Sequence, residues 1–517
     1  MSRLYCILAL VSPALTGGAS IAAQAVERSD VPARGVLWVT FDPRIMTWNS
    51  EFTDGGRLGL GRGLTGDTVG ATYIPTVGRL QQDVRLASGV AGFIASLGQG
   101  LLSVRQERRT YPVTAELGLT DRLAVSLMVP IVRVATRAAL QLSPTGSNLG
   151  LNPRLTDATA STQYASFFSQ FNAALAQLDA NIAGGTMYGC PSSLQCAAAR
   201  DSSAAWHVMR DALTEAVYGV GQSPAPFMPR DSSDAGRSIA GRVTATQQKL
   251  DTAYGIPTFT AALRLPSDTI DAGVMAAVIQ DSANGFGYRS TPFRNSWRYN
   301  LGDVELAAKY RFAAGAHYAA AAVAVLRLPT GAIDSADEFL HQSIGDHQTD
   351  LEGRLMQELI VGPLWLNVAV RAGTQRPGTR VRRVAPWDAL LVPFAATTAL
   401  RWDPGDYLGV DVAPLVRLAP QFAAGVTAGY WTKGRDHYAF QSQQDSIALA
   451  ARLGGPTPAS VLDAGTSQRW LRLGFALTYS APTVEGGFSI EQTVTGAGVV
   501  PAATVYRIVF RASRKFF

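Results

Sequence analysis

The chain of 517 residues has no apolar run long enough for a membrane-spanning helix beyond its N-terminal region. Such a helix needs roughly 20 mostly apolar residues in succession. The first residues form a basic start, an apolar stretch at 4–15 that is too short to span, and a small-x-small site at Ala23-Gln24-Ala25. This pattern predicts a signal peptide over 1–25 and an exported mature chain without a spanning helix.

Charge is also scarce, because 16% of the residues are charged, against roughly 25% in a soluble domain. The net charge is +6, and the arginines are spread singly instead of forming a basic patch. We therefore expect no nucleic-acid partner. Lipids of the outer membrane are the partners that we expect for the basic surface.

Cysteine is nearly absent, with three in the chain, and removal of the signal peptide leaves Cys190 and Cys196. Two close cysteines in an exported protein suggest a disulfide in a loop. Two free thiols are the alternative.

The C-terminal residues 505–517 alternate like a β-strand. Tyr506, Ile508 and Phe510 share one face, Arg507 and Arg511 share the other, and the chain ends on Phe. A terminal strand with apolar and polar faces and a final aromatic is typical of outer-membrane β-barrels. It predicts contact with the barrel-assembly machinery and an outer-membrane location.

Period-two alternation recurs along the chain. The candidate strands have about 10–15 residues, near the 9–11 that cross a bilayer, which argues against a soluble β-sandwich. Short turns at 120–121, 313–316, 362–363, 419–420 and 481–482 would be periplasmic, and the longer connections would lie outside. The fold class expected is all-β, a transmembrane antiparallel β-barrel.

The strand count depends on residues 379–402. If they form two strands joined by a tight turn at Val392-Pro393, the barrel has about 14 strands, and if they form a loop it has 12. We favour 14, because 394–402 alternates like a strand.

Residues 157–255 depart from this pattern and follow helical spacing. Phe168 and Phe171 begin one apolar stripe, Trp206 begins a second, and Tyr254 ends a third. The domains expected are the signal peptide 1–25, first barrel strands with an outer loop at 26–136, an extracellular helical insertion at 137–297, and the remaining strands at 298–517. The insertion is a surface loop, or a cap or plug in which Phe168, Phe171, Trp206 and Tyr254 bind an apolar ligand.

Charged residues on the polar strand faces should point into the lumen, because a charge facing lipid at mid-depth costs roughly 2–4 kcal/mol. Their mixed signs predict a narrow interior with many ion pairs. The set is Glu305, Lys309, Arg311, Glu352, Arg354, Glu358, Arg371 and Arg472.

No catalytic, cofactor or metal motif stands out. Residues 341–350 hold two histidines and two aspartates, a pattern that fits a solvated outer loop better than a metal site. There is no Gly-x-Ser-x-Gly motif. We expect no catalytic residues, no metal, no cofactor and no enzyme activity.

Residues 302–312, with the sequence GDVELAAKYRF, resemble an element of the outer-membrane proteins associated with the meta-pathway of phenol degradation. Residues 326–331, 120–123 and 128–130 resemble further parts of those proteins. That family is similar to the long-chain fatty-acid transporters, which have fourteen strands and an N-terminal plug. The resemblance covers about 100–136 and 298–517. The chain departs from it because only about ten mature residues precede the first strand, so we expect no N-terminal plug.

The function expected is a channel or transporter for small hydrophobic molecules, of fatty-acid or aromatic type. A structural or surface-interaction barrel without a conduit is the alternative, and a barrel enzyme acting on lipids is a third reading. The ligand, the direction of transport and the oligomeric state do not follow from the sequence.

Overall fold

The computed structural model describes residues 27–289, 293–340, 342–481 and 483–516. The predicted signal peptide at 1–25 lies outside the described residues. In the described part of the chain, no helix is long and apolar enough to cross a membrane.

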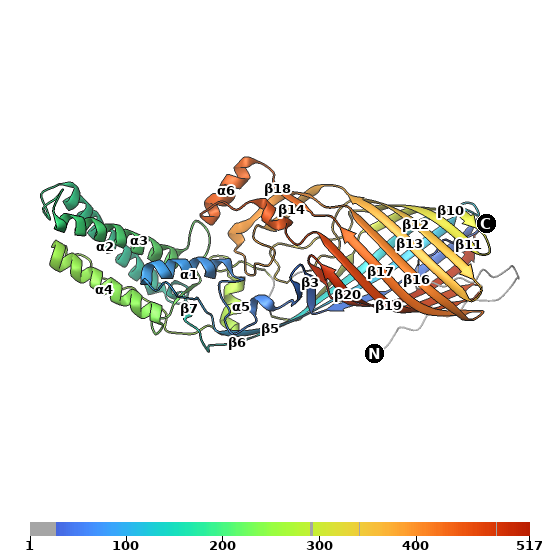
Figure 1. The fold of residues 1–517 in the computed structure, drawn as a ribbon, viewed down its shortest axis with the longest axis horizontal. Coiled ribbons are helices and arrows are strands. Elements are labelled where there is room, and N and C mark those ends of the chain that lie inside the picture. The colour runs from blue at the N-terminus through green and yellow to red at the C-terminus, as the bar shows by residue number, and fades with distance from the viewer. Residues whose placement is uncertain (1–26, 290–292, 341, 482, 517) are drawn as a thin grey trace.

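The main feature is a closed antiparallel β-barrel (Figure 1). Its 14 strands fill twelve positions, because β1 and β2 share one position and β9 and β10 share another. Pairing of β1 with β22 closes the ring. The strands in ring order are β1 (Val36–Phe41) with β2 (Arg44–Trp48), β5 (Gln99–Gly118), β6 (Leu123–Ser143), β9 (Ser296–Leu301) with β10 (Val304–Ala314), β11 (Tyr318–Leu328), β12 (Asp350–Val361), β13 (Leu364–Gln375), β16 (Tyr407–Ala419), β17 (Phe422–Lys433), β19 (Gln468–Ser480), β20 (Val484–Ala497) and β22 (Thr504–Lys515).

The favoured count of 14 barrel strands is wrong, and the alternative of 12 is correct. Residues 378–403 do form two strands, β14 (Gly378–Arg383) and β15 (Thr397–Asp403), but they pair with each other and with β18 (His437–Phe440) outside the ring. They have 6 and 7 residues, fewer than the 9–11 that cross a bilayer. Alternation marks any half-buried sheet, so it did not separate this small sheet from the barrel wall.

The outward face of the barrel is apolar. On β10, for example, Leu306, Ala308, Tyr310 and Phe312 are exposed on the outward face, and the residues that alternate with them are less exposed. Aromatic side chains mark both ends of this face. Phe422 and Tyr479 pack together near the short turns, and Trp297 and Tyr299 stack at the opposite end.

The tight connections lie where the sequence predicted them. β5–β6, β10–β11, β12–β13, β16–β17 and β19–β20 are hairpins with two to four residues between their strands. Gly362 has φ of +57° in one of these turns, a conformation that favours glycine. The hairpin turns gather at the end of the barrel that also holds the C-terminus (Figure 1). That this end is periplasmic stays a prediction.

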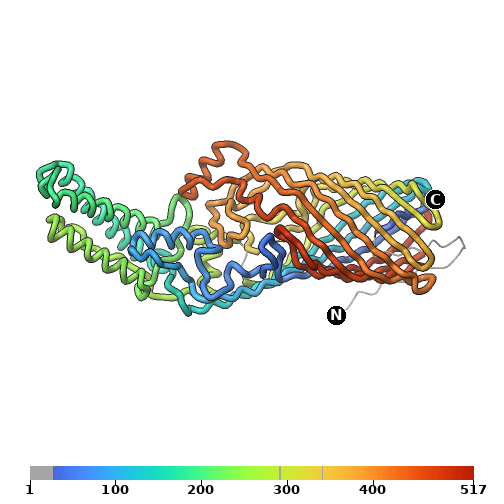
Figure 2. Tube along the Cα trace, viewed as in Figure 1, coloured from blue at the N-terminus to red at the C-terminus, as the bar shows by residue number. Residues whose placement is uncertain are grey.

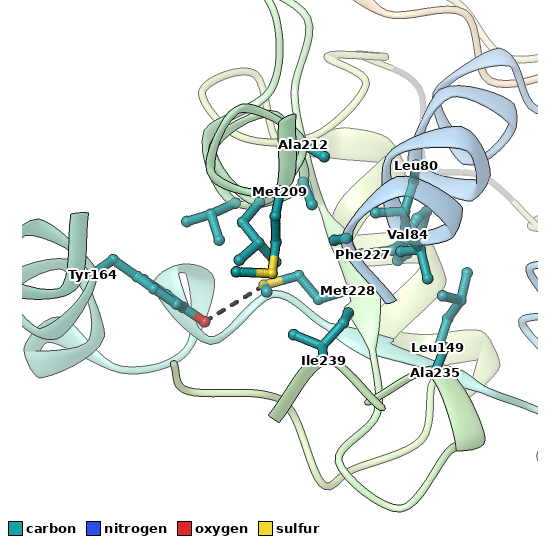
Figure 3. Close-up of a cluster of buried hydrophobic side chains, with 14 of the residues drawn as sticks. Leu80, Val84, Leu149, Tyr164, Met209, Ala212, Phe227, Met228, Ala235 and Ile239 are labelled. Carbon is teal, nitrogen blue, oxygen red and sulfur yellow. Dashed lines mark hydrogen bonds between the residues drawn. The ribbon is translucent and has the colours of Figure 1, made fainter. Parts of the chain in front are cut away.

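Most helices lie beyond the other end of the barrel (Figure 1). They are α1 (Pro75–Ser88), α2 (Ala158–Ala183), α3 (Leu194–Tyr218), α4 (Asp234–Tyr254), α5 (Ala272–Gln280) and α6 (Gln443–Leu453). We call α1–α5 the helical unit, because one hydrophobic core joins them. Figure 3 shows part of this core, where Tyr164 donates a hydrogen bond toward the sulfur of Met228 at 3.5 Å.

The helical unit is joined to the barrel by the extended hairpin of β5 and β6, which run on past the other strands (Figure 2). They have 20 and 21 residues. The boundary expected at 136–137 therefore falls inside β6. The smaller elements are β3 (Ser50–Thr53), β4 (Gly56–Gly59) and β21 (Val500–Pro501) in one sheet, β7 (Leu149–Leu151) and β8 (Phe227–Pro229) in another, and the 3-10 helices η1 (Arg62–Leu64), η2 (Pro153–Leu155), η3 (Phe394–Ala396) and η4 (Ala459–Asp463).

Candidate functional site

The barrel lumen contains two adjoining cavities. One of about 590 Å³ is lined mainly by β5, β6, β10, β11 and β12, and one of about 400 Å³ mainly by β13, β16, β17, β19 and β20. Glu27, Arg44, Arg371 and Trp431 line both. Both volumes are in the range of small-molecule sites, roughly 300–1,000 Å³.

Residues 27–34, which we call the lumen segment, bridge opposite walls of the barrel. Ser29 is fully buried, and its N–H and Oγ both donate to Oε1 of Glu358 on β12 at 2.7 Å. Asp30 pairs with Arg511 on β22 at 3.4 Å. β12 and β22 are six positions apart in the ring of twelve, so the segment crosses the lumen.

The expectation that nothing would plug the barrel from the N-terminal side is therefore wrong. A few residues are enough, because polar contacts hold them instead of an apolar core. Arg28 lies 3.3 Å from Asp30 and has its guanidinium over the ring of Trp365. Glu27 lies 3.6 Å from Arg371.

The inward charges that the sequence singled out form a network with the lumen segment. Arg354 contacts Glu352 and lies 3.3 Å from Glu305, which in turn pairs with Arg327 at 2.8 Å. Tyr407 donates to Glu352 at 2.5 Å. This arrangement agrees with the predicted interior of paired charges.

The other predicted lumen residues differ in their contacts. Glu358 holds the lumen segment and also accepts from Nε1 of Trp365 at 3.1 Å. Arg371 pairs with Asp411, and Lys309 lines the larger cavity. Nε of Arg311 is buried with no hydrogen-bond partner among the described residues.

Arg472 is held without an ion pair. Like Arg311, it has no carboxylate within ion-pair distance in the described part of the chain, and its Nε donates to Oγ1 of Thr493 at 3.3 Å. Its guanidinium lies over the ring of Trp470, 4.1 Å from the centroid. The positive charge is thus held against an aromatic face at the edge of the smaller cavity.

Tyr407, Trp431 and Trp470 form what we call the aromatic ladder. The rings of Tyr407 and Trp431 are 4.5 Å apart, and those of Trp431 and Trp470 are 6.3 Å apart, both stacked. The strand register makes this possible, because Trp431 and Trp470 lie directly opposite each other on β17 and β19. A Cβ at Gly373 would overlap the ring of Tyr407, so glycine leaves the space that this ring needs.

Tyr407, Trp431 and Trp470 are not among the site residues that the sequence predicts. The sequence does show three aromatic residues at the ends of predicted strands that lie on one side of the barrel, on the strand faces that also carry charged residues. Their shared register could be recognised only once the strand order was known.

The four predicted ligand-binding aromatics lie in the hydrophobic core of the helical unit. Phe171 stacks on Phe259 at 4.6 Å, and Trp206 packs edge-to-face against Tyr254 at 5.9 Å. Phe168 packs against a neighbouring tyrosine ring and is also buried. Packing of the helices on one another accounts for these apolar stripes, and ligand contact at the four positions stays a prediction.

The helical unit also holds a disulfide and a partly buried link between an acid, a serine and a histidine. Cys190, in the link between α2 and α3, forms a disulfide with Cys196 in the first turn of α3. Asp179 accepts hydrogen bonds from Ser203 and from Nε2 of His207 at 2.8 Å, so the carboxylate separates the hydroxyl from the imidazole. A serine nucleophile needs the reverse order, with the imidazole in the middle. Among the described residues no group of His, Cys, Asp and Glu is arranged to hold a metal ion.

No protein-family model matches the chain, and no curated protein sequence does either. Among solved structures, it is similar to an outer membrane channel from Pseudomonas putida F1, with 7% identity, 94% of this chain and 98% of that chain covered, and a TM-score of 0.42. It is similar to a FadL homologue of Pseudomonas aeruginosa, with 7% identity, coverage of 93% and 90%, and a TM-score of 0.27. It is also similar to a mutant of the TodX monoaromatic hydrocarbon channel, with 9% identity, coverage of 94% and 91%, and a TM-score of 0.27. The function proposed below rests on the residues of this chain.

Proposed function

We propose that this protein is an outer-membrane channel for small hydrophobic molecules, and that aromatic compounds are its substrates. The observation that carries the proposal is the aromatic ladder beside the 400 Å³ cavity in the lumen. Rings that already stack on one another can still pack edge-to-face against a planar aromatic guest, a contact worth about 0.5–1.5 kcal/mol. A long flexible alkyl chain gains no comparable geometric match there.

The apolar outer face, with aromatics at both ends, supports a place in a lipid bilayer. In a bacterial envelope a closed barrel of this kind belongs in the outer membrane, with lipids around it and with β22 as the strand that the assembly machinery engages. The helical unit then lies on the outer side, as a cap over the mouth.

The lumen segment supports a gated channel. It crosses the lumen between opposite walls, and it is held there by hydrogen bonds and ion pairs that water can replace. Passage of a substrate would require residues 27–34 to break their contacts with Glu358 and Arg511.

The test compares two tryptophans in whole-cell uptake of a labelled monoaromatic hydrocarbon, because lipopolysaccharide slows passive entry of apolar molecules. Trp431→Ala removes the middle of the ladder. Trp297→Ala removes an exposed tryptophan of the outer face and is the matched control. We expect Trp431→Ala to change uptake several-fold at equal surface expression and Trp297→Ala to leave it unchanged. Equal uptake by both variants would contradict an aromatic route through the lumen.

A structural barrel without a conduit is the second candidate, favoured by the same lumen segment. Uptake no faster than in cells without the protein, even after removal of residues 27–34, would support that reading.

A further inference from the structure

A separate pocket of about 180 Å³ lies outside the barrel, where α1, α3 and the end of α6 meet residues 384–396. Most of its lining is apolar, from prolines, alanines, valines and leucines together with Phe227. Two of the lining residues, Leu80 of α1 and Phe227 of β8, appear in the buried cluster of Figure 3. The volume slightly exceeds the roughly 150 Å³ of an engineered cavity that holds benzene. It therefore suits one ring or a short alkyl group.

Asp83 introduces a charge into this apolar lining. It is 7% exposed and lines the pocket. Among the described residues, no hydrogen bond or ion pair engages its carboxylate. A buried carboxylate without a partner is costly, and native proteins rarely retain one without a reason.

The charged neighbours of Asp83 do not supply the missing partner. Arg79, one turn earlier on α1, donates its Nη1 to the backbone oxygen of Leu453 at 2.9 Å. Glu215, from α3, lines the same pocket and is a second negative charge. Burial, followed by repulsion from Glu215, raises the pKa of Asp83 to about 7, although Arg79 opposes the shift.

The chemistry of the pocket limits the class of ligand. An anion would be repelled by the two carboxylates. A neutral apolar molecule would leave Asp83 without a partner. A metal ion such as Ca²⁺ needs six to eight oxygen ligands, and an apolar lining does not offer them. An organic ammonium ion supplies both an apolar body and hydrogen-bond donors for carboxylates.

We propose that this pocket binds a small organic cation, with an apolar body about the size of one aromatic ring against Leu80 and Phe227 and a protonated amine on Asp83 and Glu215. The pocket lies outside the lumen, so this proposal and the proposed channel function can be tested separately.

The test is titration calorimetry of the full chain in detergent with benzylamine, and with benzyl alcohol as its neutral isostere. At pH 8 we expect benzylamine to bind about 10- to 100-fold more tightly than benzyl alcohol, as one charge-assisted contact implies. Asp83→Asn keeps the shape of the side chain and should remove this preference. Glu215→Gln, at an exposed position, should reduce it partly. Asp201→Asn, on the exposed surface of α3, is the matched control and should leave binding unchanged.

The pH dependence gives a second readout. The amine stays protonated between pH 6 and pH 8, while Asp83 passes from neutral to ionised as the pH rises through its pKa of about 7. Affinity for benzylamine should therefore rise with pH in the native chain, by up to about tenfold per unit below that pKa, and should be flat in Asp83→Asn. Absence of benzylamine binding at pH 8, equal affinity for the alcohol, or unchanged binding by the Asp83→Asn variant would each overturn the proposal.

Discussion

Replacement of Glu358 by glutamine should release the lumen segment without unfolding the barrel. Glu358 is 4% exposed and accepts from the N–H and the Oγ of Ser29, both at 2.7 Å. It also lies 3.9 Å from Arg28. The amide oxygen of glutamine can still accept from Ser29, whereas the NH2 group in the place of Oε2 cannot accept from Nε1 of Trp365, so the change removes the charge and one hydrogen bond and keeps the shape.

The size of the effect follows from these contacts. Hydrogen bonds to a charged group contribute about 1.5–3 kcal/mol and neutral ones about 0.5–1.5 kcal/mol. Loss of the charge should therefore weaken the hold on the segment by about 1–2 kcal/mol. A change of this size raises the population of the released state about 5- to 30-fold.

Single-channel recording in planar bilayers measures that population as the fraction of time that the channel is open. Glu491→Gln is the matched control, because Glu491 lines the smaller cavity, accepts from Thr427 and, among the described residues, makes no hydrogen bond or ion pair with the lumen segment. Both variants remove one negative charge from the lumen. An equal open fraction in the two variants would refute the proposal that the lumen segment gates the channel by leaving its binding site.

Three further predictions concern the helical unit. Because burial raises the pKa of Asp83 to about 7, the folded state binds a proton more strongly than the unfolded state, and stability falls as the pH rises from about 4 to about 7. Asp83→Asn should remove this fall and stabilise the helical unit at pH 8 by about 2 kcal/mol, with no gain at pH 4. This value is half of the free energy that the full pKa shift implies, because the pocket opens to solvent. Hydrogen exchange of α1 at the two pH values measures the stability, and an equal effect of the substitution at both would contradict the prediction. Phe171→Ala should destabilise the unit by about 3–5 kcal/mol, seen as faster proteolysis with the barrel intact, whereas Leu194→Ala at a 91% exposed site should change nothing. Reduction of the disulfide between Cys190 and Cys196, which closes a short loop, should cost about 2 kcal/mol, and unchanged unfolding of the helical unit under reducing conditions would argue against that contribution.

The barrel could be predicted from the sequence because its signals are local. Alternation along one strand and a short polar or glycine turn, as at Gly362, need no knowledge of distant residues. The number of strands could not be derived in this way. A hairpin in the wall and the hairpin of β14 and β15 outside it have the same alternation, and only the pairing partners separate them.

α1 was missed although its signals are local. Val77, Leu80, Val84 and Ala87 follow helical spacing, and Gly89 ends the helix in the left-handed region. The sequence predicts an outer loop over this stretch, and α1 is a helix within that loop.

The site in the lumen could not be predicted from local sequence patterns. Which carboxylates would hold the lumen segment depends on contacts between residues more than 300 positions apart, such as Ser29 and Glu358. The sequence identified the inward charges as a class. It did not indicate that the mature N-terminal residues would be among their partners.

The most direct measurement for the central claim is whole-cell uptake of a labelled monoaromatic hydrocarbon by cells that express the native chain or a chain lacking residues 27–34. The proposed channel predicts uptake above that of cells without the protein, and faster uptake when the lumen segment is absent. Uptake equal to the protein-free cells in both cases, at confirmed surface expression, would contradict a route through the lumen.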